Sequence, residues 1–311
     1  MIEKNFRTSL CSIPVEGTNF KVRKNRSQGQ CPITPKTAIV SLVQSTKKAG
    51  FPAPDFYDID MLLPHIIDTD IENYFSSYKP YVIGLSAVTS TSYSQVKKIA
   101  SIARKVLPDS WIVMGGYLSA SSEAVLKSTE VDLTVVGDGE IAWVKILEHV
   151  QKYPDRKNFQ TKAKLIEVKG VAFLDENGKI NLNGFGVSIP AEEMLYADYE
   201  LLKTGLKDKP ELITNYLRPA SAVGWFDFDD RAKDKDRGKF LAGIYTSKGC
   251  VARCTFCQRS TKGYRTNPLE HLDNHLKYLK ENFNVGHIIV LDENFGSNKK
   301  QAYQIADTFK K

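Results

Sequence analysis

The sequence contains no long apolar run and no large excess of one charge. Its longest uncharged stretch, residues 80–96, has 17 residues, six of which are Ser or Thr, so it is too short and too polar to span a membrane as a helix. Its 43 basic and 36 acidic side chains are mixed along the chain and leave a net charge of +7. A nucleic-acid-binding surface would need basic residues gathered on one face, so we expect neither a membrane nor a nucleic acid as a partner.

The N-terminal residues lack the apolar segment of a secretory signal peptide. Cysteine is scarce, with five residues, and this odd number argues against a disulfide framework. These absences predict a cytoplasmic protein. An apolar content of 42% excludes wholesale disorder, and a chain of 311 residues is expected to form two domains.

Strand and helix patterns predict an α/β protein. Buried-strand patterns such as residues 81–87 and 111–114 alternate with amphipathic helix patterns, which indicates a parallel, doubly wound, Rossmann-like sheet. The alternation stops in the middle of the chain, where Asn177-Gly178 indicates a hairpin, and later restarts. The predicted segments are an irregular N-terminus over residues 1–36, a ligand-binding domain over 37–152, a connector with the hairpin over 153–239, and a second α/β domain over 240–311.

Three cysteines, Cys250, Cys254 and Cys257, lie within eight residues between a predicted strand and a predicted helix. In α/β folds this position is at the carboxyl edge of the sheet, where active sites gather. Thiolates suit soft metals, and a four-iron cluster held by only three cysteines leaves one iron open to a substrate or a cofactor. The spacing therefore predicts an iron–sulfur, metal-binding site.

Two blander interpretations of these cysteines stay open. Zinc could bind the three thiols with His271 or His275 as the fourth ligand, which would make the chain a zinc-stabilised binding module. Cys254 and Cys257 alone also have the spacing of a thioredoxin-like redox pair. Zinc sites usually combine two Cys-x2-Cys motifs, and this sequence has one. The redox interpretation leaves the third cysteine without a role.

The loop GCVARCTFCQR, residues 249–259, resembles the cluster loop of the radical S-adenosylmethionine (SAM) superfamily. The resemblance implies that Cys250, Cys254 and Cys257 hold a [4Fe–4S] cluster whose open iron is chelated by SAM. It also implies that Phe256 packs near the cluster and the adenine of SAM. Reductive cleavage of SAM would then give methionine and a 5′-deoxyadenosyl radical.

The sequence Asp292-Glu293-Asn294 follows the next predicted strand. It resembles the second-strand motif that holds the amino group of SAM in cobalamin-linked members of the superfamily. We therefore expect these three residues to bind SAM. The alternative is an acidic strand end on a solvated edge.

The N-terminal half resembles the cobalamin (B12)-binding domain that precedes the radical SAM domain in one large class. The resemblance rests on residues 79–91, 111–120 and 131–143. Small residues follow the predicted strands of this half, where a flat corrin could approach the backbone at the carboxyl edge. Each glycine could instead serve only a tight turn. The expected cobalamin-binding residues are Ser86, Thr89, Gly115, Gly116, Gly137 and Gly139.

Two further patterns bear on the ligand. Many cobalamin domains supply a lower axial histidine through an Asp-x-His-x-x-Gly motif, and this sequence has none, so cobalamin would bind without that histidine. Gly137-x-Gly139-x-x-Ala142 fits the dinucleotide fingerprint. It follows a late strand, however, whereas that fingerprint belongs to the first βα turn.

The resemblance implies a radical SAM enzyme that transfers a methyl group to an unactivated carbon or performs a related radical reaction. It also implies a small-molecule substrate and an external reductant such as flavodoxin or ferredoxin. The second domain supplies about 70 residues for a barrel that normally needs several times that number. We therefore expect a partial (β/α) barrel, completed by a second chain. The alternative is a non-catalytic fragment, or half of a split enzyme, that binds a 4Fe–4S cluster, cobalamin or both.

Overall fold

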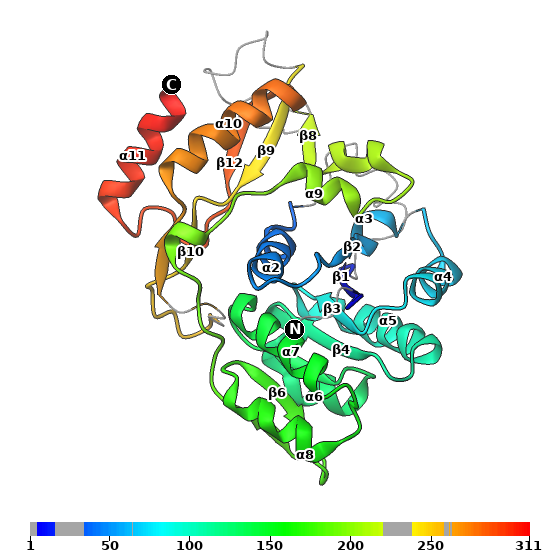
Figure 1. Ribbon diagram of the computed structural model, residues 1–311. Helices are drawn as coiled ribbons and strands as arrows, with labels where there is room; N and C mark the ends of the chain where they lie inside the picture. The colour runs from blue at the N-terminus through cyan, green and yellow to red at the C-terminus, as the bar shows by residue number, and fades with distance from the viewer. Residues whose placement is uncertain (1–4, 16–33, 64, 220–237, 258–260, 262) are drawn as a thin grey trace. The chain divides into compact units, whose positions relative to one another are not determined.

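A seven-stranded sheet forms the centre of the first part of the chain (Figure 1). Its strand order is β2-β1-β3-β4-β5-β6-β7, and the pairs among the first five strands are parallel while β6 and β7 pair antiparallel. The strands are β1 (Thr8–Ser12), β2 (Asp55–Tyr57), β3 (Val82–Ser86), β4 (Trp111–Gly115), β5 (Leu133–Val135), β6 (Val171–Leu174) and β7 (Ile180–Leu182). The predicted parallel α/β sheet is therefore confirmed.

The computed structural model describes residues 5–15, 34–63, 65–219, 238–257, 261 and 263–311. The chain divides into two compact units. The first unit comprises Met1–Gly17 and Ala38–Ile189, and the second comprises Thr18–Thr37 and Pro190–Lys311.

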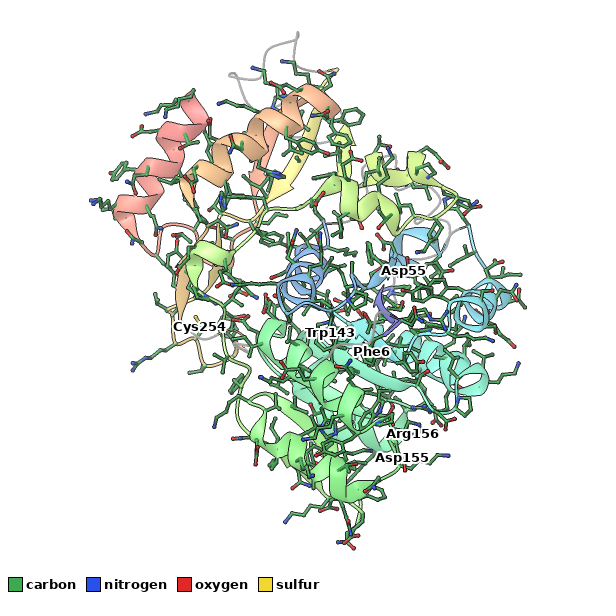
Figure 2. All side chains as sticks on the ribbon, viewed as in Figure 1. Phe6, Asp55, Trp143, Asp155, Arg156 and Cys254 are labelled. Carbon is green, nitrogen blue, oxygen red and sulfur yellow. The ribbon has the colours of Figure 1, made fainter. Side chains whose placement is uncertain are left out.

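Strands β3 and β4 at the centre of the first sheet are mostly apolar. In β3 and β4 every residue except the last is buried, as expected for parallel strands that are covered by helices on both faces. Gly84 in β3 lets an aromatic ring lie close to the sheet, since a Cβ atom there would come within 3.1 Å of Trp143. The Trp143 indole, labelled in Figure 2, also donates a 2.9 Å hydrogen bond to the buried Thr46 hydroxyl.

Helices connect these strands. The helices α2, α5, α6 and α7 match predicted helical segments, whereas α3, α4 and α8 were not predicted. In α4 only Ile71 and Phe75 are buried, and α3 and α8 have four residues each. The α-helices of the first unit are α2 (Thr37–Lys48), α3 (Ile59–Leu62), α4 (Asp68–Tyr78), α5 (Tyr93–Val106), α6 (Ser122–Ser128), α7 (Glu140–Lys152) and α8 (Phe159–Lys162). Short 3₁₀ turns are η2 (Ser90–Ser92), η3 (Tyr117–Ser121) and η4 (Ala163–Glu167).

Two expected segment boundaries differ from the structure. The segment 1–36 is not wholly irregular, because β1 pairs with both β2 and β3 inside the sheet. The TSLCS sequence of β1 is completely buried although it is mostly small and polar, so hydrophobicity does not reveal it. The connector 153–239 is also divided. Its hairpin extends the first sheet through β6 and β7, whereas residues from Pro190 onward belong to the second unit.

The second unit contains the predicted two βα repeats. Strands β9 (Phe240–Ile244) and β12 (Val285–Val290) pair in parallel, and β8 (Leu217–Pro219) pairs antiparallel to β9. A small antiparallel hairpin consists of β10 (Ser247–Gly249) and β11 (Tyr264–Thr266). The remaining elements are α9 (Tyr199–Thr204), α10 (Leu269–Phe283) and α11 (Lys299–Lys310), with the 3₁₀ turns η5 (Ala191–Glu193) and η6 (Pro210–Tyr216).

Aromatic side chains from α9, its preceding segment and α10 pack together in the second unit. His275 on α10 is 8% exposed and stacks on Tyr196 with ring centroids 5.0 Å apart. Tyr199 lies 5.0 Å from Phe283 by the same measure. Burial lowers the pKa of His275 to about 4, because a charged imidazolium would lose its hydration there.

Acidification is expected to destabilise the protein through His275. The folded pKa of about 4 lies below the value of about 6.5 for an unfolded chain, so the unfolded state takes up the proton first. The stability that the neutral ring contributes is complete above pH ~6.5 and is lost as the pH falls toward ~4. His275→Phe keeps the stacking and removes the titration. Urea unfolding should show that the variant loses about 2–3 kcal/mol less than the native chain between pH 7 and pH 4.5.

His271→Phe on the same helix is the matched control. The His271 side chain is 38% exposed, so the control should unfold with the pH dependence of the native chain. Equal pH dependence of His275→Phe and the native chain would contradict the burial argument.

Candidate functional site

The carboxyl ends of the parallel strands of the first unit form one edge of the sheet. The order β2-β1-β3-β4-β5 reverses direction between β1 and β3, which is the topological switch point where open α/β sheets bind ligands. Ser12, Ser86 and Gly115 are paired in register at the ends of β1, β3 and β4. Predicted site residues from two separate segments therefore lie side by side.

Two of the four predicted glycines have a structural reason to be glycine. Gly116 has a φ of +94°, and a Cβ atom there would lie 2.2 Å from the carbonyl oxygen of Ala87. Gly137 has a φ of +96° and forms a parallel bridge with Gly186. Positive φ is a conformation that other residues rarely adopt, so turn geometry accounts for both positions without a ligand.

The other two glycines are not explained by the fold. Among the residues that the structure describes, no heavy atom lies within 4 Å of the position that a Cβ atom would take at Gly115. At Gly139, the residue before α7, the nearest atom is Leu42 Cδ2 at 3.7 Å, an ordinary contact. Neither glycine has a positive φ. The end of β4 thus faces open space at the edge where a ligand is expected.

The predicted hydroxyl residues at this edge are placed differently from one another. Ser86 is half-buried at the end of β3, and its carbonyl accepts a 3.0 Å hydrogen bond from the Ile13 amide. The Thr89 hydroxyl is 2.7 Å from the Thr91 hydroxyl. Thr89 also precedes η2, and its carbonyl accepts the amide of Ser92. Both residues lie beyond the same strand, but the hydroxyl of Thr89 has a local partner.

Exposed apolar side chains line the same edge and were not predicted. Val88 follows β3 and is 44% exposed, Tyr117 follows β4 and is 44% exposed, and Ile141 in the first turn of α7 is 38% exposed. Apolar side chains that remain exposed around a ligand edge suit a large ligand with apolar surface. The position of Val88 and Tyr117, two residues after a buried strand, and of Ile141, in the first turn of the helix after β5, is the signal that could have identified them.

The Gly-Asp-Gly turn before α7 is covered on one side by its own chain. The Ser188 hydroxyl donates a short hydrogen bond to the buried Asp138 carboxylate, and a Cβ atom at Gly186 would lie 2.0 Å from the Asp138 carbonyl oxygen. The turn follows β5, which is separated from the β1–β3 switch point by β4. This placement does not favour the dinucleotide interpretation of Gly137-x-Gly139-x-x-Ala142.

The cysteine loop of the second unit begins at the end of β10. Cys250 is half-buried, while Cys254, labelled in Figure 2, and Cys257 are exposed. The amide of Cys257 donates a 3.2 Å hydrogen bond to the carbonyl of Cys254. Phe256 between them is 90% exposed. The exposed thiols and this aromatic ring are therefore accessible to a bound group.

Backbone pairing holds the start of this loop. Gly249 pairs with Tyr264 across the β10–β11 hairpin. Its φ is +88°, and a Cβ atom there would lie 2.3 Å from the carbonyl oxygen of Gly263. Glycine is required at this position because the two backbones approach so closely.

The structure does not bring the thiols together into a metal-ligand cluster. Across the described ranges, no group of three His, Cys, Asp or Glu side chains lies close enough together to hold a metal ion. The three thiols on one accessible loop are nevertheless a donor set that suits an iron–sulfur cluster, so the residues present fit such a group by their chemistry.

The histidines of the zinc interpretation are on α10. His275 is buried against Tyr196. His271 is 3.7 Å from the Glu270 carboxylate. Neither belongs to a group of three potential ligands in the part of the chain that the structure describes.

The predicted SAM-binding residues follow β12. The Asp292 carboxylate accepts hydrogen bonds from the amides and hydroxyls of Thr246 and Ser247 at 2.6–3.1 Å. The Asn294 side-chain amide is 3.5 Å from Cys250 Sγ. Glu293 is exposed. The structure thus places Asp292 and Asn294 against the start of the cysteine loop.

Comparison with known proteins identifies the first unit. Residues 32–147 match the family model of the B12-binding domain. An uncharacterized methyltransferase, PH0819, of Pyrococcus horikoshii is 24% identical over 255 residues, which cover 80% of this chain and 47% of that protein. Cytidylyl-2-hydroxyethylphosphonate methyltransferase of Streptomyces wedmorensis is 22% identical over 256 residues, or 78% of this chain and 45% of that protein. The chain therefore spans about half the length of these curated relatives.

Solved structures share the fold of the whole chain. TsrM of Kitasatospora setae, a radical SAM methyltransferase, has been solved with tryptophan substrate and the SAM analogue aza-SAM, and it matches with a TM-score of 0.61 at 15% identity. That match covers 98% of this chain and 50% of TsrM. TsrM with cobalamin and a [4Fe–4S] cluster bound matches with a TM-score of 0.62 at 13% identity, and covers 98% and 52% of the two chains.

These findings confirm the resemblance that the sequence shows. Residues 32–147 match the B12-binding domain, and the chain shares its α/β fold with about half of TsrM. None of the helices that the structure describes has the length and apolar composition to cross a membrane.

Proposed function

We propose that this protein is a cobalamin-dependent radical SAM methyltransferase. The observation that carries the proposal is the loop with Cys250, Cys254 and Cys257, which follows β9 and β10 in a chain that also contains a B12-binding domain. Methyltransferase relatives and the fold shared with TsrM support the same reaction class.

The edge of the first sheet is where cobalamin would bind. Gly115 faces open space, and the exposed side chains of Val88, Tyr117 and Ile141 surround the ends of β3, β4 and β5. A corrin is flat and large, so it needs small residues where it approaches the backbone and apolar side chains at its rim. The Ser86 hydroxyl and the Gly139 amide, which precedes α7, would offer polar groups to the amide and phosphate groups of its side chains and tail.

The cysteine loop is where a [4Fe–4S] cluster would bind. Cys250, Cys254 and Cys257 would hold three irons and leave the fourth open to SAM. Phe256, which is 90% exposed, would cover the cluster and the adenine. When bound, the cluster would supply the electron that cleaves SAM, and cobalamin would carry the methyl group. The Asp292 carboxylate already accepts four hydrogen bonds from Thr246 and Ser247. Glu293 and Asn294 take no part in these four bonds, so their side chains would contact SAM.

The proposed reaction implies partners. A small molecule would accept the methyl group, and flavodoxin or ferredoxin would supply electrons from outside.

Anaerobic purification followed by quantification of iron, sulfide, zinc and corrinoid tests the proposal. We expect about four irons and four sulfides per chain, one corrinoid, and reductant-dependent release of 5′-deoxyadenosine or S-adenosylhomocysteine from SAM. Zinc without sulfide would overturn the proposal in favour of a zinc-stabilised module. Bound cluster and corrinoid without turnover of SAM would favour a non-catalytic binding protein or half of a split enzyme.

A further inference from the structure

The Asp292 carboxylate is saturated by the chain itself. Oδ1 accepts the amides of Thr246 and Ser247 at 2.6 and 3.1 Å, and Oδ2 accepts their two hydroxyls, each at 2.6 Å. Hydrogen bonds to an ionised carboxylate are about twice as strong as neutral ones. These four bonds join the turn after β12 to Thr246, which links β9 to β10, and to Ser247, which begins β10, although Ser247 and Asp292 are 45 positions apart in the chain.

Thr246 and Ser247 are positioned to control the cysteine loop. They are 0% and 3% exposed, and Ser247 begins β10, whose last residue, Gly249, directly precedes Cys250. The Leu291 amide also donates a 2.7 Å hydrogen bond to the Ile244 carbonyl. Any shift of Asp292 would therefore be transmitted to the start of the loop.

Asn294 links the same turn to the first cysteine. Its side-chain amide is 3.5 Å from Cys250 Sγ, within reach of an N–H···S hydrogen bond. Hydrogen bonds to cluster sulfurs are one of the means by which proteins set reduction potentials. The turn after β12 thus contacts the loop twice, through Asp292 and through Asn294.

We propose that Asp292 is a positioning residue for the cysteine loop, and that it acts through Thr246 and Ser247 and not through direct contact with SAM. The same turn lets Asn294 donate to the Cys250 sulfur and stabilise the reduced form of a cluster bound there. The role of Asn294 toward a cluster rests on the proposed function. The role of Asp292 in holding the loop backbone does not, so each role can be tested and refuted on its own.

Isosteric changes on both sides of the contact test the loop role without a cofactor. Thr246→Val removes one hydroxyl donor from a buried position. Asp292→Asn removes the negative charge and leaves one acceptor oxygen in place of the two that receive the four hydrogen bonds. In the cofactor-free protein, hydrogen exchange of the Ser247 amide should become about tenfold faster in each variant, because a hydrogen bond to a charged group is lost. Thr246→Ser keeps the hydroxyl and should exchange as the native chain does.

The combination of variants separates positioning from direct SAM binding. If Asp292 acts through Thr246, the Ser247 amide of the double variant Asp292→Asn/Thr246→Val should exchange more slowly than the product of the two single-variant accelerations predicts. In the holoprotein, Thr246→Val should release iron to a chelator about tenfold faster than the native protein does. Weaker SAM binding in Asp292→Asn with unchanged Ser247 exchange, and no effect of Thr246→Val, would overturn the inference. A native chain that takes up no iron would overturn the proposed function. The hydrogen-exchange measurement on the cofactor-free protein would still decide whether Asp292 positions the loop.

The Asn294 contact has its own spectroscopic readout. Asn294→Leu removes the donor at similar volume, so the midpoint potential of the cluster should become more negative in a redox titration followed by electron paramagnetic resonance. Asn274→Leu, at an exposed position on α10, is the control and should keep the native potential. An unchanged potential in Asn294→Leu would refute the contribution of this hydrogen bond.

Discussion

Serine in place of Cys254 is expected to reduce the iron bound by this protein to less than about a tenth of the native content, with a matching loss of SAM cleavage. Three thiolates are the minimum that holds a four-iron cluster while one iron stays open, and a serine hydroxyl is a poor ligand for a soft metal. Cys254 is exposed on its loop, so the substitution should leave the fold intact. Iron and sulfide analysis after anaerobic reconstitution, together with the melting temperature, measures both effects.

Cys11→Ala is the control for a general effect of thiol loss. Cys11 is buried in β1 of the first unit, so this variant should lose some stability but retain iron. A Cys254→Ser protein that kept its full iron content would show that the ligands are not those of the Cys250–Cys257 loop.

Valine in place of Gly115 is expected to weaken cobalamin binding by at least about tenfold, since even one misplaced side chain in a preformed ligand site costs this much. A Cβ atom at Gly115 would meet no atom of the described residues within 4 Å, and β4 has an ordinary strand conformation there. The added methyl groups would therefore fit the folded protein and occupy the space that the flat ligand needs. Equilibrium dialysis against hydroxocobalamin measures the affinity.

Gly238→Val provides the matched control. A Cβ atom at Gly238 also meets nothing within 4 Å in the part of the chain that the structure describes, but this residue lies in the second unit. Both variants should melt within about 2 °C of the native chain, because surface substitutions away from special features change stability by about 0.5 kcal/mol or less. Native affinity in Gly115→Val would place the ligand elsewhere than over the end of β4.

Much of the architecture was predictable because local patterns and long-range packing agree. The apolar runs that became β3 and β4 are buried along almost their full length, and the amphipathic pattern of α5 buries Val96, Ile99, Ala100 and Ala103. Such segments have few alternatives, since a continuous apolar run must be covered on both faces. The polar strand β1 was missed because its burial depends on its neighbours β2 and β3 and not on its own hydrophobicity.

The candidate sites separate in the same way. The sequence by itself determined which chemical groups are available, because the three cysteine thiols, the aromatic Phe256 and the small residues at strand ends are properties of residue type and spacing. Only the tertiary structure decided what these residues contact. It showed that Gly116 serves a turn while Gly115 faces open space, and that the Asp292 carboxylate is occupied by Thr246 and Ser247. These contacts join residues that are far apart in the chain, and no local pattern records which of them a fold brings together.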